Sequence, residues 1–95
     1  MKVTVEFLSI PLITQPLGKK KIEVEFRGST LSDLAGELGA KIKRAKDILL
    51  AGDGTIDNDI QVYINGGDRV QREDIQSRKL SEGDTITFML LVAGG

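Results

Sequence analysis

The sequence contains no cysteine and no histidine. These absences exclude disulfides, thiolate nucleophiles, zinc sites built from Cys and His, and histidine general bases. The 13 basic and 14 acidic residues give a net charge of -1, without the basic excess that is typical of nucleic-acid-binding domains. Aromatic residues make up only 4% of the chain, so we expect a mostly aliphatic core. No nucleophile and base can be paired from the sequence, and we expect a protein that is not an enzyme.

Long apolar runs are also missing. In the opening stretch, MKVTVEF, apolar residues alternate with polar ones, which is unlike the apolar run of a signal peptide. No stretch approaches the length of a membrane span. The 95 residues correspond in length to one domain. We therefore expect a single cytoplasmic domain over residues 1–95, with neither membrane nor nucleic acid as partner.

Four segments show the period-two alternation of half-buried strands, namely residues 3–7, 22–26, 60–64 and 85–92. The first two are joined by residues 9–20, which hold both prolines and are predicted to be an irregular connection. Consecutive strands of this kind pair antiparallel by default. Asn65 and Gly66 predict a tight turn, because both residues tolerate positive φ. A short returning strand is expected at residues 69–72.

A different period follows the second strand. Thr30 is a good N-cap with Asp33 three residues later, and an apolar helical stripe comes next, at Leu31, Leu34, Ala35 and Leu38. Gly39 is the predicted stop of this helix. A short second helix is expected near residues 42–49. Strands followed by a helix and more strands predict an α+β fold, with the helix on one face of the sheet.

Two polar features have a functional and a plain interpretation. Asp53, Asp57 and Asp59 alternate as in a calcium loop, but loop positions six and twelve would be Asn58 and Ile64. A solvated loop without metal is the favoured prediction. The basic runs at residues 19–21 and 41–46 are expected to be solvated surface, with a docking patch for an acidic partner as the alternative.

The last segment, FMLLVAGG, leads from a strand almost directly into Gly94 and Gly95. Glycine has no Cβ, so such a tail can enter a tunnel that is too narrow for other residues. Residues 91–95, if extended, would reach roughly 17 Å. Met89 and Leu91 are predicted to lie on the outward face of the strand, where an apolar patch beside the tail suits docking onto a partner. The alternatives are a covering loop over this patch and a tail without function.

The sequence resembles the ubiquitin-like sulfur carriers of the MoaD/ThiS group over essentially its whole length. The resemblance is carried by VTVEFLSIP, KIEVEFRGSTLSDLAGELG, VYINGGDRV and LSEGDTITFMLLVAGG. It implies a β-grasp fold, with a mixed sheet of four to five strands and one main helix packed across it. The first and last strands are then expected to be parallel and central, and the tail from about residue 92 to residue 95 to be flexible.

The resemblance also implies a chemistry. An ATP-dependent adenylyltransferase of the ubiquitin-activating type would adenylate the Gly95 carboxylate, and a sulfur donor enzyme would convert it to a thiocarboxylate. A synthase subunit would then accept the sulfur. The chain itself would bind no cofactor, since ATP is used by the activating partner. The reacting residues would be Gly95 and Gly94, and the residues expected to contact partners are Phe88, Met89, Leu91, Val92 and Ala93.

These motifs do not single out the biosynthetic pathway that would receive the sulfur. The chain length and the long segment between helix and third strand resemble the small subunit of molybdopterin synthase. The VAGG ending also occurs among thiamine-type carriers. We expect molybdopterin biosynthesis first, and as alternatives another sulfur-containing metabolite, a protein modifier joined through Gly95, or a plain β-grasp interaction domain.

Overall fold

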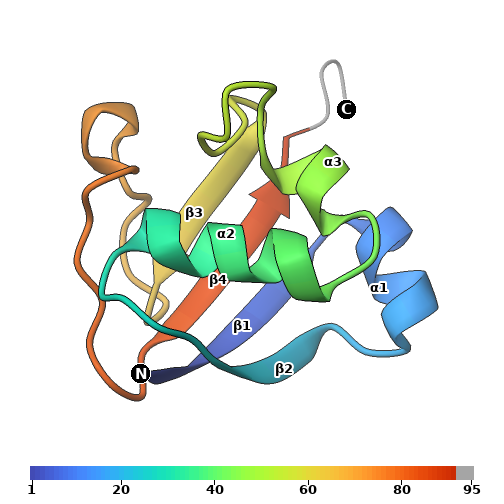
Figure 1. Cartoon of the computed structure of the whole chain (residues 1–95), viewed down its shortest axis with the longest axis horizontal. Helices are drawn as coiled ribbons and strands as arrows, with labels where there is room; N and C mark the ends of the chain where they lie inside the picture. Colours follow the sequence, from blue (N-terminus) through green and yellow to red (C-terminus); the bar gives the residue numbers. More distant parts are fainter. Residues whose placement is uncertain (92–95) are drawn as a thin grey trace.

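The fold is a four-stranded mixed sheet crossed on one face by a long helix (Figure 1). A computed structural model describes residues 1–91. The strands are β1 (Lys2–Leu8), β2 (Lys21–Glu25), β3 (Ile60–Ile64) and β4 (Thr85–Leu90). The helices are α1 (Pro11–Leu17), α2 (Leu31–Lys41), α3 (Ala45–Leu49) and the short 3-10 helix η1 (Arg72–Asp74). None of the helices within residues 1–91 is long and apolar enough to cross a membrane.

The two central strands are parallel, as the family resemblance implied. The sheet order is β2-β1-β4-β3, and β1 pairs with β4 in parallel register. The outer pairs, β1 with β2 and β3 with β4, are antiparallel. Because β1 and β4 run the same way, their carboxyl ends lie together at one end of the sheet. Residue 91, the last one described, follows β4 at this end.

The core lies between the sheet and α2. The predicted apolar stripe of α2 is fully buried, as are Val5, Phe7 and Phe88 on the facing side of the sheet. The rings of Phe7 and Phe88 stack with their centroids 6.1 Å apart. Thr30 caps α2 as predicted: its side chain accepts a hydrogen bond from the Asp33 N–H, and the Asp33 carboxylate accepts one from the Thr30 N–H. This reciprocal cap fixes where α2 begins.

Residues 11–17 form the helix α1, so the prediction of an irregular connection was wrong. Pro11 occupies the first turn, where the N–H that proline lacks would have no helical partner. Gly18 ends the helix in the left-handed conformation, with φ 81°. Ile13 is completely buried. Burial of that side chain supplies a reason for a helix that Pro16, inside it, argues against.

Three other boundaries differ from the predictions. Gly39 does not stop α2, which continues to Lys41. A Cβ at position 39 would lie 3.3 Å from Leu50 and 3.5 Å from Lys46, so this glycine lets α3 pack closely. Residues 69–72 make only an isolated bridge, Tyr63 with Arg69, in place of a strand. The last strand ends at Leu90, not at residue 92.

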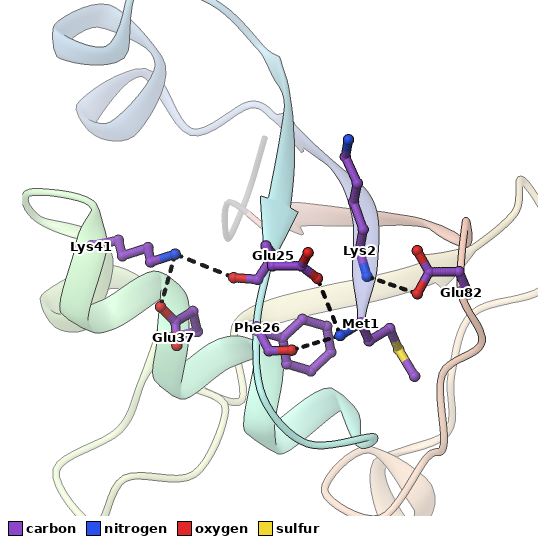
Figure 2. A network of polar contacts seen from close by, with 7 residues as sticks. All are labelled: Met1, Lys2, Glu25, Phe26, Glu37, Lys41 and Glu82. Carbon is purple, nitrogen blue, oxygen red and sulfur yellow. Dashed lines mark hydrogen bonds and ion pairs between the residues drawn. The ribbon is translucent and has the colours of Figure 1, made fainter.

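Polar contacts hold β2 to the beginning of β1 and to the end of α2 (Figure 2). The Met1 amino group donates to the Phe26 carbonyl at 2.9 Å and lies 3.2 Å from the Glu25 carboxylate. Lys41 Nζ donates to the Glu25 carbonyl at 3.2 Å and pairs with Glu37 at 3.1 Å. Exposed pairs of this kind contribute at most about 1 kcal/mol each. They lie far along the sheet from the carboxyl end of β4.

Candidate functional site

Part of the predicted site lies outside the described residues. Val92, Ala93, Gly94 and Gly95 belong to this part, so nothing in the structure bears on them. The described residues form the surface from which this segment continues. That surface is the carboxyl end of β1 and β4, together with the face of the sheet that α2 does not cover (Figure 1).

An apolar patch lies at this end of the sheet. Leu8 and Met89 are opposite each other on the parallel central strands, and Gln61 flanks Met89 on β3. Both apolar side chains are half-buried, on the sheet face away from the core. Leu91 follows β4, and its side chain is 55% exposed. We call Leu8, Met89 and Leu91 the tail-side patch.

The same face becomes polar with distance from the tail. The Thr87 hydroxyl donates to the Glu6 carboxylate at 3.2 Å, and Thr4 and Thr85 lie opposite each other further along. The predicted outward position of Met89 is therefore confirmed, and this face of the sheet changes from polar to apolar character along β4. Docking of a partner on the tail-side patch stays a prediction.

Phe88 is not part of this surface. Its side chain is 0% exposed and stacks on Phe7 in the core. The sequence-based expectation that Phe88 contacts a partner is therefore wrong. The physical reason is the two-residue period of β4, which turns Phe88 toward α2 while its neighbour Met89 points away.

Hydrogen bonds fix the main chain at Leu91. Its N–H donates to the Asp59 carbonyl at 2.8 Å, which extends the pairing with β3 beyond the last strand residue. The loop that carries Asp59 is held in turn by Arg72. The Arg72 guanidinium donates to the carbonyls of Asp57 and Ile60 and to the side chain of Asn58. The starting point of the tail is thus bonded to the loop before β3, which Arg72 holds in turn.

Leu8 and Arg72 were missed by the sequence reasoning. A signal for Leu8 exists, because it continues the outward positions Thr4 and Glu6 of the first strand. No comparable signal exists for Arg72, whose contacts reach back 12 to 15 positions to a loop.

The acidic loop binds its own backbone. The Thr55 hydroxyl and N–H both donate to the Asp53 carboxylate, at 2.6 and 3.0 Å, and lower the pKa of that carboxyl. Asp57 accepts a hydrogen bond of 2.9 Å from the Asp59 N–H. Such Asx turns stabilise a polar loop. Within residues 1–91, no cluster of three or more acidic side chains is arranged to hold a metal ion.

The chain is similar to a protein-family model and to several solved structures. Residues 13–95 match the model of the ThiS family. A chain in the crystal structure of the Amycolatopsis orientalis BexX/CysO complex is 29% identical, with a TM-score of 0.70, covering 98% of this chain and 99% of that chain. The Haloferax volcanii HVO 2177 protein is 26% identical, with a TM-score of 0.77, over 100% of this chain and 87% of that chain.

The similarity of fold extends to more distant sequences. SAMP1 from Haloferax volcanii has a TM-score of 0.78 at 18% identity, with full coverage of both chains. At this identity the likeness concerns the fold alone, and it agrees with the β-grasp architecture that the sequence predicted. A search of curated proteins gave no match.

Proposed function

The chain belongs to the ThiS family of ubiquitin-like sulfur carriers, and on this premise we propose that it carries sulfur on the carboxylate of Gly95. The observation that carries the proposal is the extent of the family match, which includes Gly94 and runs to residue 95. The sulfur would be held as a thiocarboxylate and donated to a biosynthetic acceptor.

The proposed chemistry has two steps, adenylation of the carboxylate and displacement of AMP by sulfur. A Gly95 carboxylate oxygen attacks the α-phosphorus of ATP and pyrophosphate leaves, which gives an acyl adenylate. Sulfur at the oxidation level of sulfide then attacks the acyl carbon, and AMP leaves with the bonding electron pair. A carboxylate is a poor electrophile until AMP becomes its leaving group, so the adenylate is the activated species. No redox agent is consumed when the donor is hydrosulfide.

The tail-side patch supports the proposal, because a partner that takes up the tail must also hold the domain. Leu8 and Met89 belong to the central strands, and sites on strands are held more precisely than sites on loops. We propose that the adenylyltransferase docks here, with Leu91 at the centre of the contact. The partner enzymes then supply the catalytic groups and bind ATP, while this chain supplies the handle and the reacting terminus.

We propose a pterin as the sulfur acceptor, that is, molybdopterin biosynthesis. The support is the resemblance of chain length, and of the long segment from residue 42 to residue 59 between α2 and β3, to the small subunit of molybdopterin synthase. The other acceptors are distinguished by experiment. A thiazole precursor would indicate the thiamine pathway, and a lysine of a target protein would indicate a modifier.

The test is intact mass spectrometry of the purified chain after incubation with the adenylyltransferase, MgATP and sulfide. We expect the mass gain of one oxygen-to-sulfur exchange, located at Gly95 by fragmentation. A chain that lacks Gly95 is the control and should show no exchange. Persistent absence of the exchange in the intact chain would contradict the proposal.

The acceptor is then tested with the thiocarboxylated chain. Incubation with the large synthase subunit and a pterin precursor should transfer the sulfur and return the chain to its original mass. Transfer to a thiazole precursor alone would contradict the pterin assignment and retain the carrier function. Lys79 is the last basic residue, so trypsin would leave residues 80–95 on the lysines of a conjugated target; such remnants in native cells, without any thiocarboxylate, would indicate a modifier instead.

A further inference from the structure

A groove separates α1 from the connection between α2 and α3. One of its two cavities has a volume of about 230 Å³ and is lined by Ile13, Pro16, Leu17, Lys41, Ile42 and Lys43. The other, of about 270 Å³, is lined by Pro11, Leu12, Gln15, Pro16, Lys43 and Arg44. The cavities share Pro16 and Lys43 as lining residues, so they are two separate depressions that lie next to each other. We call the two together the α1 groove.

One wall of the α1 groove is apolar. Pro11, Leu12 and Pro16 are exposed side chains of α1, and Leu17 is half-buried beside them. Leu12 is 55% exposed, which within residues 1–91 makes it and Leu91 the large hydrophobic side chains left most open to water. Exposed apolar surface of this kind, rimmed by polar residues, is typical of an interaction site.

The opposite wall is positively charged. Lys41, Lys43 and Arg44 line the cavities, and no acidic side chain lines either of them. Lys41 is paired with Glu37, but among the described residues Lys43 and Arg44 form no ion pair. This concentration of cations stands out on a chain whose net charge is -1. A ligand that complements the groove is therefore negative, with an apolar part that covers Leu12.

The size of the cavities distinguishes between classes of ligand. Small-molecule sites usually measure about 300 to 1,000 Å³, and each of these cavities lies below that range. A row of two shallow depressions instead fits successive side chains of a peptide. Binding of single-stranded nucleic acid is disfavoured, because no aromatic side chain lines the groove on which a base could stack.

The position of the groove also matters. β1 leads through Ile10 into α1, and its last residue, Leu8, is paired with Met89 of β4. The amino end of α1 therefore starts from the same end of the sheet as residue 91, and Figure 1 shows α1 and α3 on that side of the molecule. A protein that docks on the tail-side patch can thus reach the α1 groove with another segment.

We propose that the α1 groove binds an acidic segment of a partner protein, with a large apolar side chain of that segment packed on Leu12 and carboxylates paired with Lys43 and Arg44. This contact is separate from the tail-side patch. It would fix the orientation of a partner that binds the chain, because two contacts hold a bound partner better than one.

Selection from a phage-displayed library of random peptides on the intact protein tests the proposal. Enriched peptides should carry acidic residues next to Leu, Ile or Phe. Synthetic copies of them should shift the backbone amide signals of residues 11–17 and 41–44 in the ¹⁵N-labelled protein. Their affinity should fall as salt is raised, because exposed charge pairs are screened.

Matched variants locate the interaction. Lys43→Glu with Arg44→Glu should weaken peptide binding at least tenfold, on the order expected from reversing two attractive pairs. Arg78→Glu with Lys79→Glu makes the same charge change at two exposed residues near the other end of α2, and should have little effect. Leu12→Ser should weaken binding, whereas Leu91→Ser, at equal exposure, should not.

Several results would overturn the proposal. These are a selection that yields no peptides or only neutral and basic ones, amide shifts that lie outside the groove, and equal effects of the two charge-reversed pairs. Binding to phosphatidylserine vesicles in place of peptides would overturn it as well. The peptide assay does not involve Gly95, so its failure and the failure of the sulfur chemistry are independent of each other.

Discussion

The N–H of Leu91 donates a hydrogen bond of 2.8 Å to the carbonyl of Asp59. This bond holds the last described residue to the loop before β3, and Arg72 holds the same loop from the other side. The domain therefore presents its tail from a fixed point at the end of the sheet. Residue 91, from which the tail continues, is thereby held beside the tail-side patch.

Arg72→Ala should loosen this anchor. Removal of the guanidinium leaves the Ile60 carbonyl without this donor and the Asp57 carbonyl with the Ile60 N–H alone, so the Leu91 amide should exchange its hydrogen about tenfold faster, equal to about 1.4 kcal/mol. Hydrogen exchange followed by NMR measures this change. Arg69→Ala is the control, because Arg69 contacts Gln61 instead of the loop. Equal acceleration in both variants would contradict the anchoring role.

Met89→Glu should impair activation of the carrier. A charge in the centre of the tail-side patch opposes burial against a partner, and we expect kcat/KM of adenylation to fall by about tenfold or more. Thr85→Glu places the same charge on the same strand and face, but away from the tail, and should change kcat/KM little. Pyrophosphate release by the adenylyltransferase is the measurement. Similar losses in both variants would argue against docking on this patch.

Phe88→Ala should destabilise the fold, because it removes a fully buried ring that stacks on Phe7. The expected loss in free energy of unfolding is about 3–5 kcal/mol. Leu91→Ala, at an exposed position, should change that free energy by no more than about 0.5 kcal/mol. Urea denaturation distinguishes the two. A small effect at Phe88 would contradict its assignment to the core.

The same substitution at two glycines should have opposite effects. At Gly28 φ is +111° and an added Cβ would lie 2.4 Å from the Asp33 carboxylate, so Gly28→Ala should destabilise the fold by about 1–3 kcal/mol. At Gly36, inside α2, an added Cβ meets nothing within 4 Å, and alanine should stabilise by about 0.5–1 kcal/mol. Thermal unfolding of both variants gives the comparison, and shifts of the same sign would contradict it.

Stability should decrease in acid partly through Asp33. The Ser29 and Thr30 N–H groups and the Thr30 hydroxyl lower the pKa of this carboxyl. The Asp33 carboxyl therefore binds its proton less tightly in the native state than in the unfolded chain, where the pKa of Asp is about 3.9. The stabilisation is present above that value and is lost as the pH falls through the lower, native pKa. Asp33→Asn should reduce this dependence, as measured by urea denaturation across acidic pH, and an unchanged slope would count against the cap.

Local sequence patterns predicted many of the secondary-structure elements. The alternation of β1, the capping of α2 by Thr30 and Asp33, and the turn at Asn65 and Gly66 depend on neighbours a few residues away. Such short-range preferences can be read from the chain, because the same contacts form wherever the segment folds. The Gly94 and Gly95 pair likewise pointed to the family before the fold was known.

Local propensity failed where packing decides. Two prolines argued against a helix at residues 11–17, yet burial of Ile13 holds one there. Gly39 has the properties of a helix stop, yet α2 continues past it because the missing side chain leaves room for α3. In both cases, packing outweighs a local preference, which amounts to about 3 kcal/mol for proline inside a helix and about 1 kcal/mol for glycine.

The sequence by itself therefore determined the α+β class, the main helix, most strands and the family. Only the tertiary structure decided which side chains share a surface. Glu6 and Thr87 are 81 positions apart and hydrogen-bonded, and the same parallel register brings Leu8 beside Met89. The α1 groove exists only because α1 packs opposite residues 41–44. Surfaces of this kind result from long-range packing, which no local pattern in the chain encodes.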